Sequence, residues 1–182
     1  MSVSLALAQT TLLLRDLLLQ SLRRDPGWVL TGGTPRITTL PHGKPDKGIG
    51  DRLNLALVSA LPSAVVANAV VANAAAAMPS FDLRYLVTAH VFTTLHVELL
   101  LGMVLQAVAD SPVLGASQAA NAEPIEAELM AGTGRAATPS RLSIGDIAGL
   151  RLEPLRLPAL IIDVSPVVAV PDGIVQSLTI ER

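Results

Sequence analysis

The chain contains no cysteine. This absence excludes a disulfide framework, a thiolate metal site and a cysteine nucleophile. Aromatic residues make up only 2% of the chain and charged residues only 15%, with a net charge of −2. Because binding to a nucleic acid backbone depends on a field of lysine and arginine, this composition argues against a nucleic-acid partner.

Apolar residues are abundant instead. They account for 51% of the 182 residues, and most are leucine, valine and alanine. This length suits one domain with a substantial core. So little charge leaves few polar groups to cover the outside of a monomer, so we expect a buried interface between subunits. Arg15 and Asp16 interrupt the first apolar run, which does not match a signal peptide, and we expect a cytoplasmic protein.

The most membrane-like segment is 55–78, in a chain whose mean hydropathy is +0.53. It contains Pro62, Asn68, Asn73 and two serines, and its second half is rich in alanine. A spanning helix needs about 20 strongly apolar residues, and this segment does not supply them. The sequence predicts no membrane span. A membrane-surface binding protein that uses residues 62–78 stays open as an alternative.

Two segments have the apolar spacing of helices. The first is capped by Ser2 or Ser4 and extends to about Arg24. Its polar residues are expected to form one solvent-facing stripe, made of Gln9, Asp16, Gln20, Arg23 and Arg24. The second begins at Thr93 or Thr94 and ends near Asp110, and its nearly continuous apolar surface predicts that it is largely buried.

The expected strands lie at 28–40 (best at 37–40), 53–61, 81–92 and 159–170. In the last of these, Pro166 predicts either an edge position or a bulge. Residues 41–52 are expected to be a loop, 62–80 mostly a loop, and 116–140 a mobile insertion, with a short helical turn after Ser143. The fold class is therefore α+β. We expect a single domain with a mixed, mostly antiparallel sheet of about four to five strands packed by two main helices.

The strand at 81–92 has one apolar face and one semi-polar face. The semi-polar face carries Arg84, Thr88 and His90, and we expect it to be exposed to water or to another subunit. Edge pairing with a neighbouring copy is expected near Ile37 and in the C-terminal strand, at Val168. These five residues are the candidate subunit interface.

No pattern in the chain points to catalysis. His90 and His96 lie six residues apart across a strand-to-helix junction, whereas metal-binding histidines on one helix lie four apart. The glycine-rich segments 31–34 and 132–135 lack the strand, helix and lysine of a phosphate-binding loop. The chain has no Gly-x-Ser-x-Gly elbow, and its carboxylates are scattered. We expect no enzyme activity, cofactor or metal; a small enzyme with a His-centred site stays open as an alternative.

The order of elements resembles a known family. The strand with Leu83, Tyr85, Leu86, Thr88 and Ala89 is followed by a helix with Leu101, Gly102 and Val108, and by the exit Pro112-Val113-Leu114. This pattern is similar to the tail-terminator or tube-cap proteins of phage-tail-like contractile injection systems. The upstream segment Leu53-Asn54-Leu55 resembles that family's Val-Asn-Leu strand. Residues 142–147 and the final strand resemble its late helix and closing strand.

The resemblance implies structural work rather than chemistry. A protein of this kind forms a homo-oligomeric ring, hexameric in this reading, on the distal end of the inner tube. The ring stops tube growth and ties off the sheath, so its partners would be further copies of itself, the inner tube protein and the sheath protein. The particle would assemble in the cytoplasm and could later be released or docked to a membrane. A closed ring uses contacts between two different surfaces of each copy.

Overall fold

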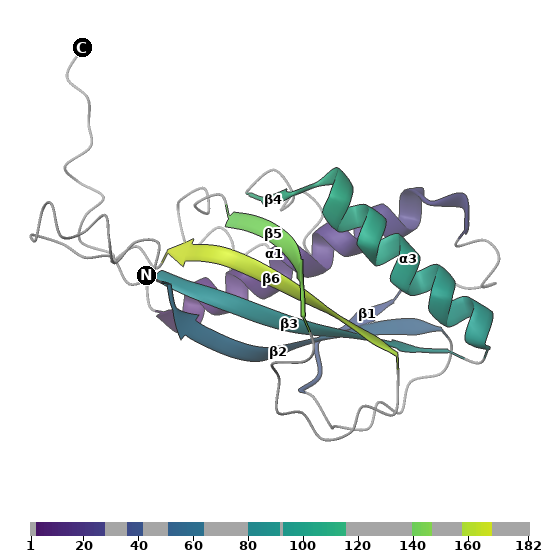
Figure 1. Cartoon of the computed structure of the whole chain (residues 1–182), viewed down its shortest axis with the longest axis horizontal. Coiled ribbons are helices and arrows are strands. Elements are labelled where there is room, and N and C mark those ends of the chain that lie inside the picture. The colour runs from purple at the N-terminus through teal and green to yellow at the C-terminus, as the bar shows by residue number, and fades with distance from the viewer. Residues whose placement is uncertain are drawn as a thin grey trace, which may run out of the picture.

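A computed structural model describes residues 3–27, 36–41, 51–63, 80–91, 93–115, 140–146 and 158–168. Within them the chain is an α+β domain with two helices and one six-stranded sheet (Figure 1). In chain order the elements are α1 (Val3–Arg24), β1 (Ile37–Thr38), β2 (Arg52–Pro62), β3 (Ser80–His90), α3 (Thr94–Asp110), β4 (Val113–Leu114), β5 (Ser140–Gly145) and β6 (Ala159–Val168).

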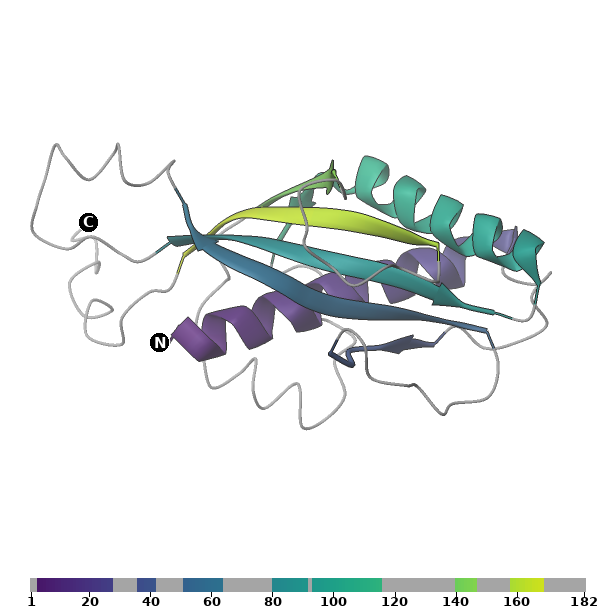
Figure 2. The same cartoon turned by 60° about the horizontal axis from the view of Figure 1, so that its bottom comes forward.

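The sheet has the strand order β1-β2-β3-β6-β5-β4. Only β1 and β2 are parallel, and every other neighbouring pair is antiparallel. Figure 2 shows the short β1 alongside β2 at one edge. The predicted fold class is confirmed. The strand count exceeds the expected four to five because two strands fall outside the predicted ones: β4, which has only two residues, and β5, which lies partly where a helical turn was expected.

The hydrophobic core lies between the two helices and one face of the sheet, which we call the helix face. Alternation along the strands directs one set of side chains toward the helices. That set is Leu53, Leu55, Leu83, Tyr85, Val87, Ala89, Leu142, Ile162 and Val164. From α1 the core receives Leu13, Leu14 and Leu18, and from α3 Leu100 and Val104. The apolar face predicted for the strand at 81–92 is therefore confirmed.

The opposite face of the sheet, here called the outer face, is less exposed than the sequence predicts. Leu86 is 1% exposed and Thr88 6%, although both belong to the face expected to be semi-polar and open. Leu86 lies in register between Ala56 of β2 and Ile161 of β6, which are also buried. Cross-strand pairing with these apolar neighbours makes the middle of the outer face a second, small apolar patch.

The polar stripe predicted for helix α1 is partly buried. Gln9 and Asp16 are buried, at 5% and 4% exposure, because α1 packs against both the sheet and α3. The Asp16 carboxylate accepts a hydrogen bond from the guanidinium of the adjacent Arg15 at 2.9 Å. A buried carboxylate needs such a charged partner.

Helix α3 is less buried than predicted. Its buried residues are Leu100, Met103, Val104, Ala107 and Val108. On its other side Leu95 is 63% exposed and Leu105 42%. The cap at its start is as expected, because the Thr93 hydroxyl accepts a hydrogen bond from the backbone N–H of His96.

Two local predictions near the C-terminal half need correction or refinement. Residues 140–145 form strand β5, so the helical turn expected after Ser143 is wrong at least as far as Gly145. Strand β6 lies inside the sheet, between β3 and β5, and not at an edge. The alternative offered for Pro166, a bulge, is correct: between Val164 and Val167, β6 has one residue more than β3 has between Leu83 and Phe81.

Several predictions fall outside the described residues. Of the expected loop 41–52, the structure describes only Pro41, Asp51 and Arg52, and Arg52 already belongs to β2. Of the expected insertion 116–140, only Ser140 is described, as the first residue of β5. Both glycine-rich segments and residues 64–79 also lie outside the described part of the chain.

Candidate subunit-contact surface

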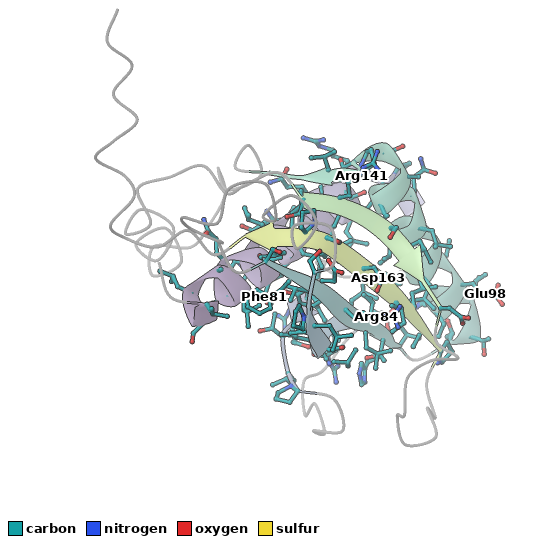
Figure 3. The ribbon with its side chains drawn as sticks, turned by 60° about the vertical axis from the view of Figure 1, so that its left-hand side comes forward. Phe81, Arg84, Glu98, Arg141 and Asp163 are labelled. Atoms are coloured by element: carbon teal, nitrogen blue, oxygen red, sulfur yellow. The ribbon has the colours of Figure 1, made fainter. Side chains whose placement is uncertain are left out.

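An ion pair stands at the centre of the outer face. Arg84 of β3 and Asp163 of β6 are paired in register, and Nε of Arg84 lies 3.0 Å from Oδ1 of Asp163. Figure 3 shows the two side chains next to each other on neighbouring strands, with Glu98 on α3 well away from them. Their side chains are 37% and 26% exposed, so the pair stays accessible to water. An ion pair this exposed contributes little to the stability of the fold.

Gly145 makes room for the Asp163 carboxylate. A Cβ atom at residue 145 would lie 2.5 Å from Oδ2 of Asp163 and 2.6 Å from Cγ2 of Ile161. Both distances are far below van der Waals contact. The glycine therefore lets the carboxylate lie over the neighbouring strand, next to Arg84.

Thr88 and His90 lie further along the same face of β3. Thr88 is buried, and its hydroxyl lies 3.3 Å from Nε2 of the half-buried His90. Of the three candidate residues on β3, Arg84 is therefore accessible to a partner, His90 is partly accessible, and Thr88 is buried. The buried state of Thr88 follows from Asn54 and Ala159, its partners on the two flanking strands.

The two remaining candidates occupy different positions in the sheet. Ile37 begins β1 at the edge, where it pairs with Leu53. The backbone of Val168 ends β6, an interior strand, and pairs with Ser80. Ile37 therefore belongs to an edge strand, as predicted, whereas the edge position predicted for Val168 is wrong.

Strand β1 is anchored by one side chain. The Asn54 amide oxygen accepts hydrogen bonds from the Thr38 hydroxyl and from the Leu40 backbone N–H, both at 2.9 Å. Its amide nitrogen donates to the Leu40 carbonyl at 3.1 Å. This asparagine belongs to the Leu53-Asn54-Leu55 segment that carries part of the family resemblance, and its contacts fix where the edge of the sheet is covered.

His96 also has a structural partner. Its Nδ1 lies 2.5 Å from Oδ2 of Asp51, which ties the start of α3 to the residue that precedes β2. A carboxylate near a helix N-terminus is also favoured by the helix dipole. Among the described residues, no group of three or more histidine, aspartate or glutamate side chains is placed to hold a metal ion.

Among the described residues, both edges of the sheet are paired only in part. On β2, strand β1 pairs with Leu53 and Asn54. No described strand pairs with residues 56–60 on the edge that points away from β3. On β5, strand β4 pairs with Ser140 and Arg141, and Leu142 donates its N–H to Pro112. No described strand follows beyond that, along residues 143–145. Strand edges of this kind can pair with another chain.

Large apolar side chains lie where no described strand pairs with these two edges. Leu57 of β2 is 39% exposed and Ile144 of β5 is 43% exposed. Leu57 also borders a groove of about 400 Å³ between α1 and the edge of β2, together with Leu12, Leu40 and Leu55. The sequence analysis named neither Leu57 nor Ile144 as a contact residue, because an edge is defined by which strands pair and not by the composition of one strand.

Comparison with known proteins gives no further assignment. No family model matches the chain, and no curated protein is similar to it at a significant level. In the part of the chain that the structure describes, neither helix combines the length and the apolar character needed to cross a membrane.

Proposed function

We propose that this protein is a structural cap that forms a homo-oligomeric ring, hexameric by the family resemblance, on the distal end of the inner tube of a contractile injection system. The ring ends tube growth and ties off the sheath. The inner tube protein and the sheath protein are its proposed partners, and the cytoplasm is the proposed place of assembly. The protein does no chemistry in this role.

The observation that carries the proposal is the pair of partly covered sheet edges. A ring of identical copies needs two different surfaces on each copy, one for each neighbour. The edges at β2 and β5 are different surfaces of one sheet, and each has an exposed apolar side chain, Leu57 on β2 and Ile144 on β5. An α+β domain with this strand order and with few charges is therefore suited to assembly.

The outer face offers a second kind of contact. Its polar part has both signs of charge, from Arg84, Arg141, Asp82 and Asp163. Arg141 is exposed at the β5 side of this face (Figure 3). Mixed charges of this kind give orientation and selectivity to a contact with a different protein. In this proposal the outer face, next to the edges, is where tube or sheath would be contacted.

The test is the position of the protein in assembled particles. A tagged copy is produced in cells that assemble the particle, and gold labelling of the tag is viewed by electron microscopy. We expect label at one end of each tube, and tubes of uncontrolled length when the protein is absent. Label spread along the tube, or normal tube length in its absence, would contradict the proposal.

A further inference from the structure

The two partly covered edges lie at the same level of the sheet. The strand register connects Leu57 to Tyr85, Tyr85 to Ile162, and Ile162 to Ile144. Leu57 and Ile144 are therefore the two ends of one cross-strand row on the helix face. The next row, on the outer face, runs from Ser59 through Arg84 and Asp163 to Ser143.

The described strands that pair with the two edges stop short of the row from Leu57 to Ile144. Strand β1 pairs with β2 as far as Asn54, β4 pairs with β5 at Ser140 and Arg141, and Leu142 donates its N–H to Pro112. Residues 56–60 of β2 and 143–145 of β5, which no described strand pairs with on this side, overlap in height. If a second copy is placed beside the first at equal height, β2 of one copy meets β5 of the other over this length.

The strand directions also match. Successive antiparallel pairings from β2 through β3 and β6 to β5 make β5 antiparallel to β2. Two copies in the same orientation therefore bring β2 and β5 together as antiparallel neighbours. This is the head-to-tail arrangement that a ring requires. A two-fold dimer would pair β2 with β2, or β5 with β5.

The backbone groups at the two edges are complementary. Leu53 donates its N–H outward to Arg36, and Leu142 donates its N–H outward to Pro112. Because these groups alternate along a strand, Leu57 and Ile144 also direct N–H and C=O outward. Placed opposite each other, they can form a hydrogen-bonded antiparallel pair.

The side chains of this pair are complementary as well. Leu57 and Ile144 are 39% and 43% exposed at the margin of the core, on the same face of the sheet. In the pairing, Ile144 of one copy meets the apolar groove beside Leu57 of the next, and both side chains lose their exposure. The register of β2 shifts between Leu57 and Ser59. Bulges of this kind bend a strand and increase its twist.

We propose that β2 of one copy pairs antiparallel with β5 of a second copy of this chain, with Leu57 opposite Ile144 and Ser59 opposite Ser143. The sheets of neighbouring copies then join into one continuous sheet. This inference names the contact on which the proposed ring depends, and so it depends on the proposed self-assembly.

The absence of cysteine allows a direct test by disulfide cross-linking. In one chain Ser59 and Ser143 are separated by β3 and β6, about 14 Å at the usual strand spacing, so they cannot bond to each other. Residues opposite each other across an antiparallel pair are about 5 Å apart, within the range of a disulfide. A link between positions 59 and 143 therefore reports a contact between copies.

Three samples are oxidised and separated on non-reducing gels: S59C/S143C, each single variant alone, and the two single variants mixed. The double variant should give a ladder up to the ring size, the mixture only covalent dimers, and each single variant alone no dimer. A dimer from one single variant alone would overturn the head-to-tail pairing in favour of a two-fold one.

The mass of each variant, measured by light scattering, distinguishes a failure of the β2–β5 pairing from a failure of the proposed cap function. Rings without cross-links would overturn the pairing and leave the cap proposal intact. Monomers without cross-links, both in solution and in the presence of inner tubes, would overturn both.

A second experiment uses lysine variants. Leu57→Lys and Ile144→Lys should each lower the fraction of assembled protein at least tenfold, with an unchanged circular dichroism spectrum. The control Leu105→Lys, at an exposed site on α3, should leave the assembled fraction unchanged. Equal assembly in all three variants would overturn the pairing.

Discussion

The hydroxyl of Tyr85 lies 2.9 Å from the hydroxyl of Thr11 and so connects the central strand β3 to helix α1. Tyr85 has no exposed surface, and the bond to Thr11 gives its hydroxyl a partner inside the core. Burial raises the pKa of Tyr85 to about 12, and the hydrogen bond with Thr11 opposes this rise only in part.

This pKa makes stability sensitive to alkali. The unfolded chain ionises Tyr85 near pH 10 and the folded chain near pH 12, so between these values the unfolded state has fewer protons. The contribution of Tyr85 to stability should therefore be constant below about pH 10 and fall as the pH rises toward 12. Urea unfolding at pH 8 and pH 11 checks this. Tyr85→Phe should lower the free energy of unfolding by about 1 kcal/mol at pH 8, because it removes the hydrogen bond to Thr11. Between pH 8 and pH 11 this variant should lose less stability than the unsubstituted protein. An equal alkaline loss in both proteins would contradict the assignment.

Two leucines of α3 test which side of that helix is buried. Leu100 has no exposed surface, whereas Leu105 is 42% exposed. Leu100→Asp should abolish cooperative folding, because it places an uncompensated charge in the core. Leu105→Asp should change the free energy of unfolding by no more than about 0.5 kcal/mol. Thermal melts followed by circular dichroism compare the two, and a folded Leu100→Asp variant would show that the core is placed incorrectly.

Substitution by alanine should have opposite effects on stability at two glycines. Gly145→Ala should destabilise the domain by about 1–3 kcal/mol, because the new methyl group would push Asp163 and Ile161 away. Gly102 is exposed within α3, and a Cβ atom there would have no atom within 4 Å apart from its chain neighbours and the backbone of its own helix. There alanine should stabilise the fold by up to about 1 kcal/mol through helix propensity. Chemical denaturation gives both values, and the same sign for both would refute the local geometry.

Asn54 should control the order of the β1 edge. Asn54→Ala removes the hydrogen bonds to Thr38 and Leu40 and leaves their polar groups without this partner. We expect a loss of about 1–3 kcal/mol and faster amide hydrogen exchange at Leu40, with little change at Val87 in the core. Unchanged exchange at Leu40 would mean that another contact holds this segment.

Removal of residues 118–138 should leave the monomer folded. Leu114 and Ser140, on either side of the segment 116–139, pair directly with each other, so a short loop can connect them. We expect an unchanged melting temperature and weaker assembly, measured by circular dichroism and light scattering. Loss of the cooperative melt would show that the deleted residues belong to the folding core.

The sequence predicts the fold well where the apolar period is long. The ends of α1 and α3, and the apolar face around Tyr85, agree with prediction because one side of each element packs on a single core. The second face of β3 was misjudged, since Leu86 is buried by pairing with Ala56 and Ile161, which are distant in sequence. The role of Gly145 likewise depends on Asp163 in another strand.

Only some residues of the candidate contact surface could be predicted from the sequence. Arg84 and Ile37 lie where a partner could meet them, but the edge at Leu57 and Ile144 is set by where β1 and β4 stop. Two-residue strands have no period of their own, so their pairing depends on tertiary contacts such as those of Asn54.

The central claim is that copies of this chain close into a ring. Negative-stain class averages of the purified protein, alone and bound to the end of its inner tube, test it most directly. The account predicts a closed ring with one rotational symmetry, expected to be six-fold. Class averages that show only single copies or two-fold dimers in both samples would contradict it.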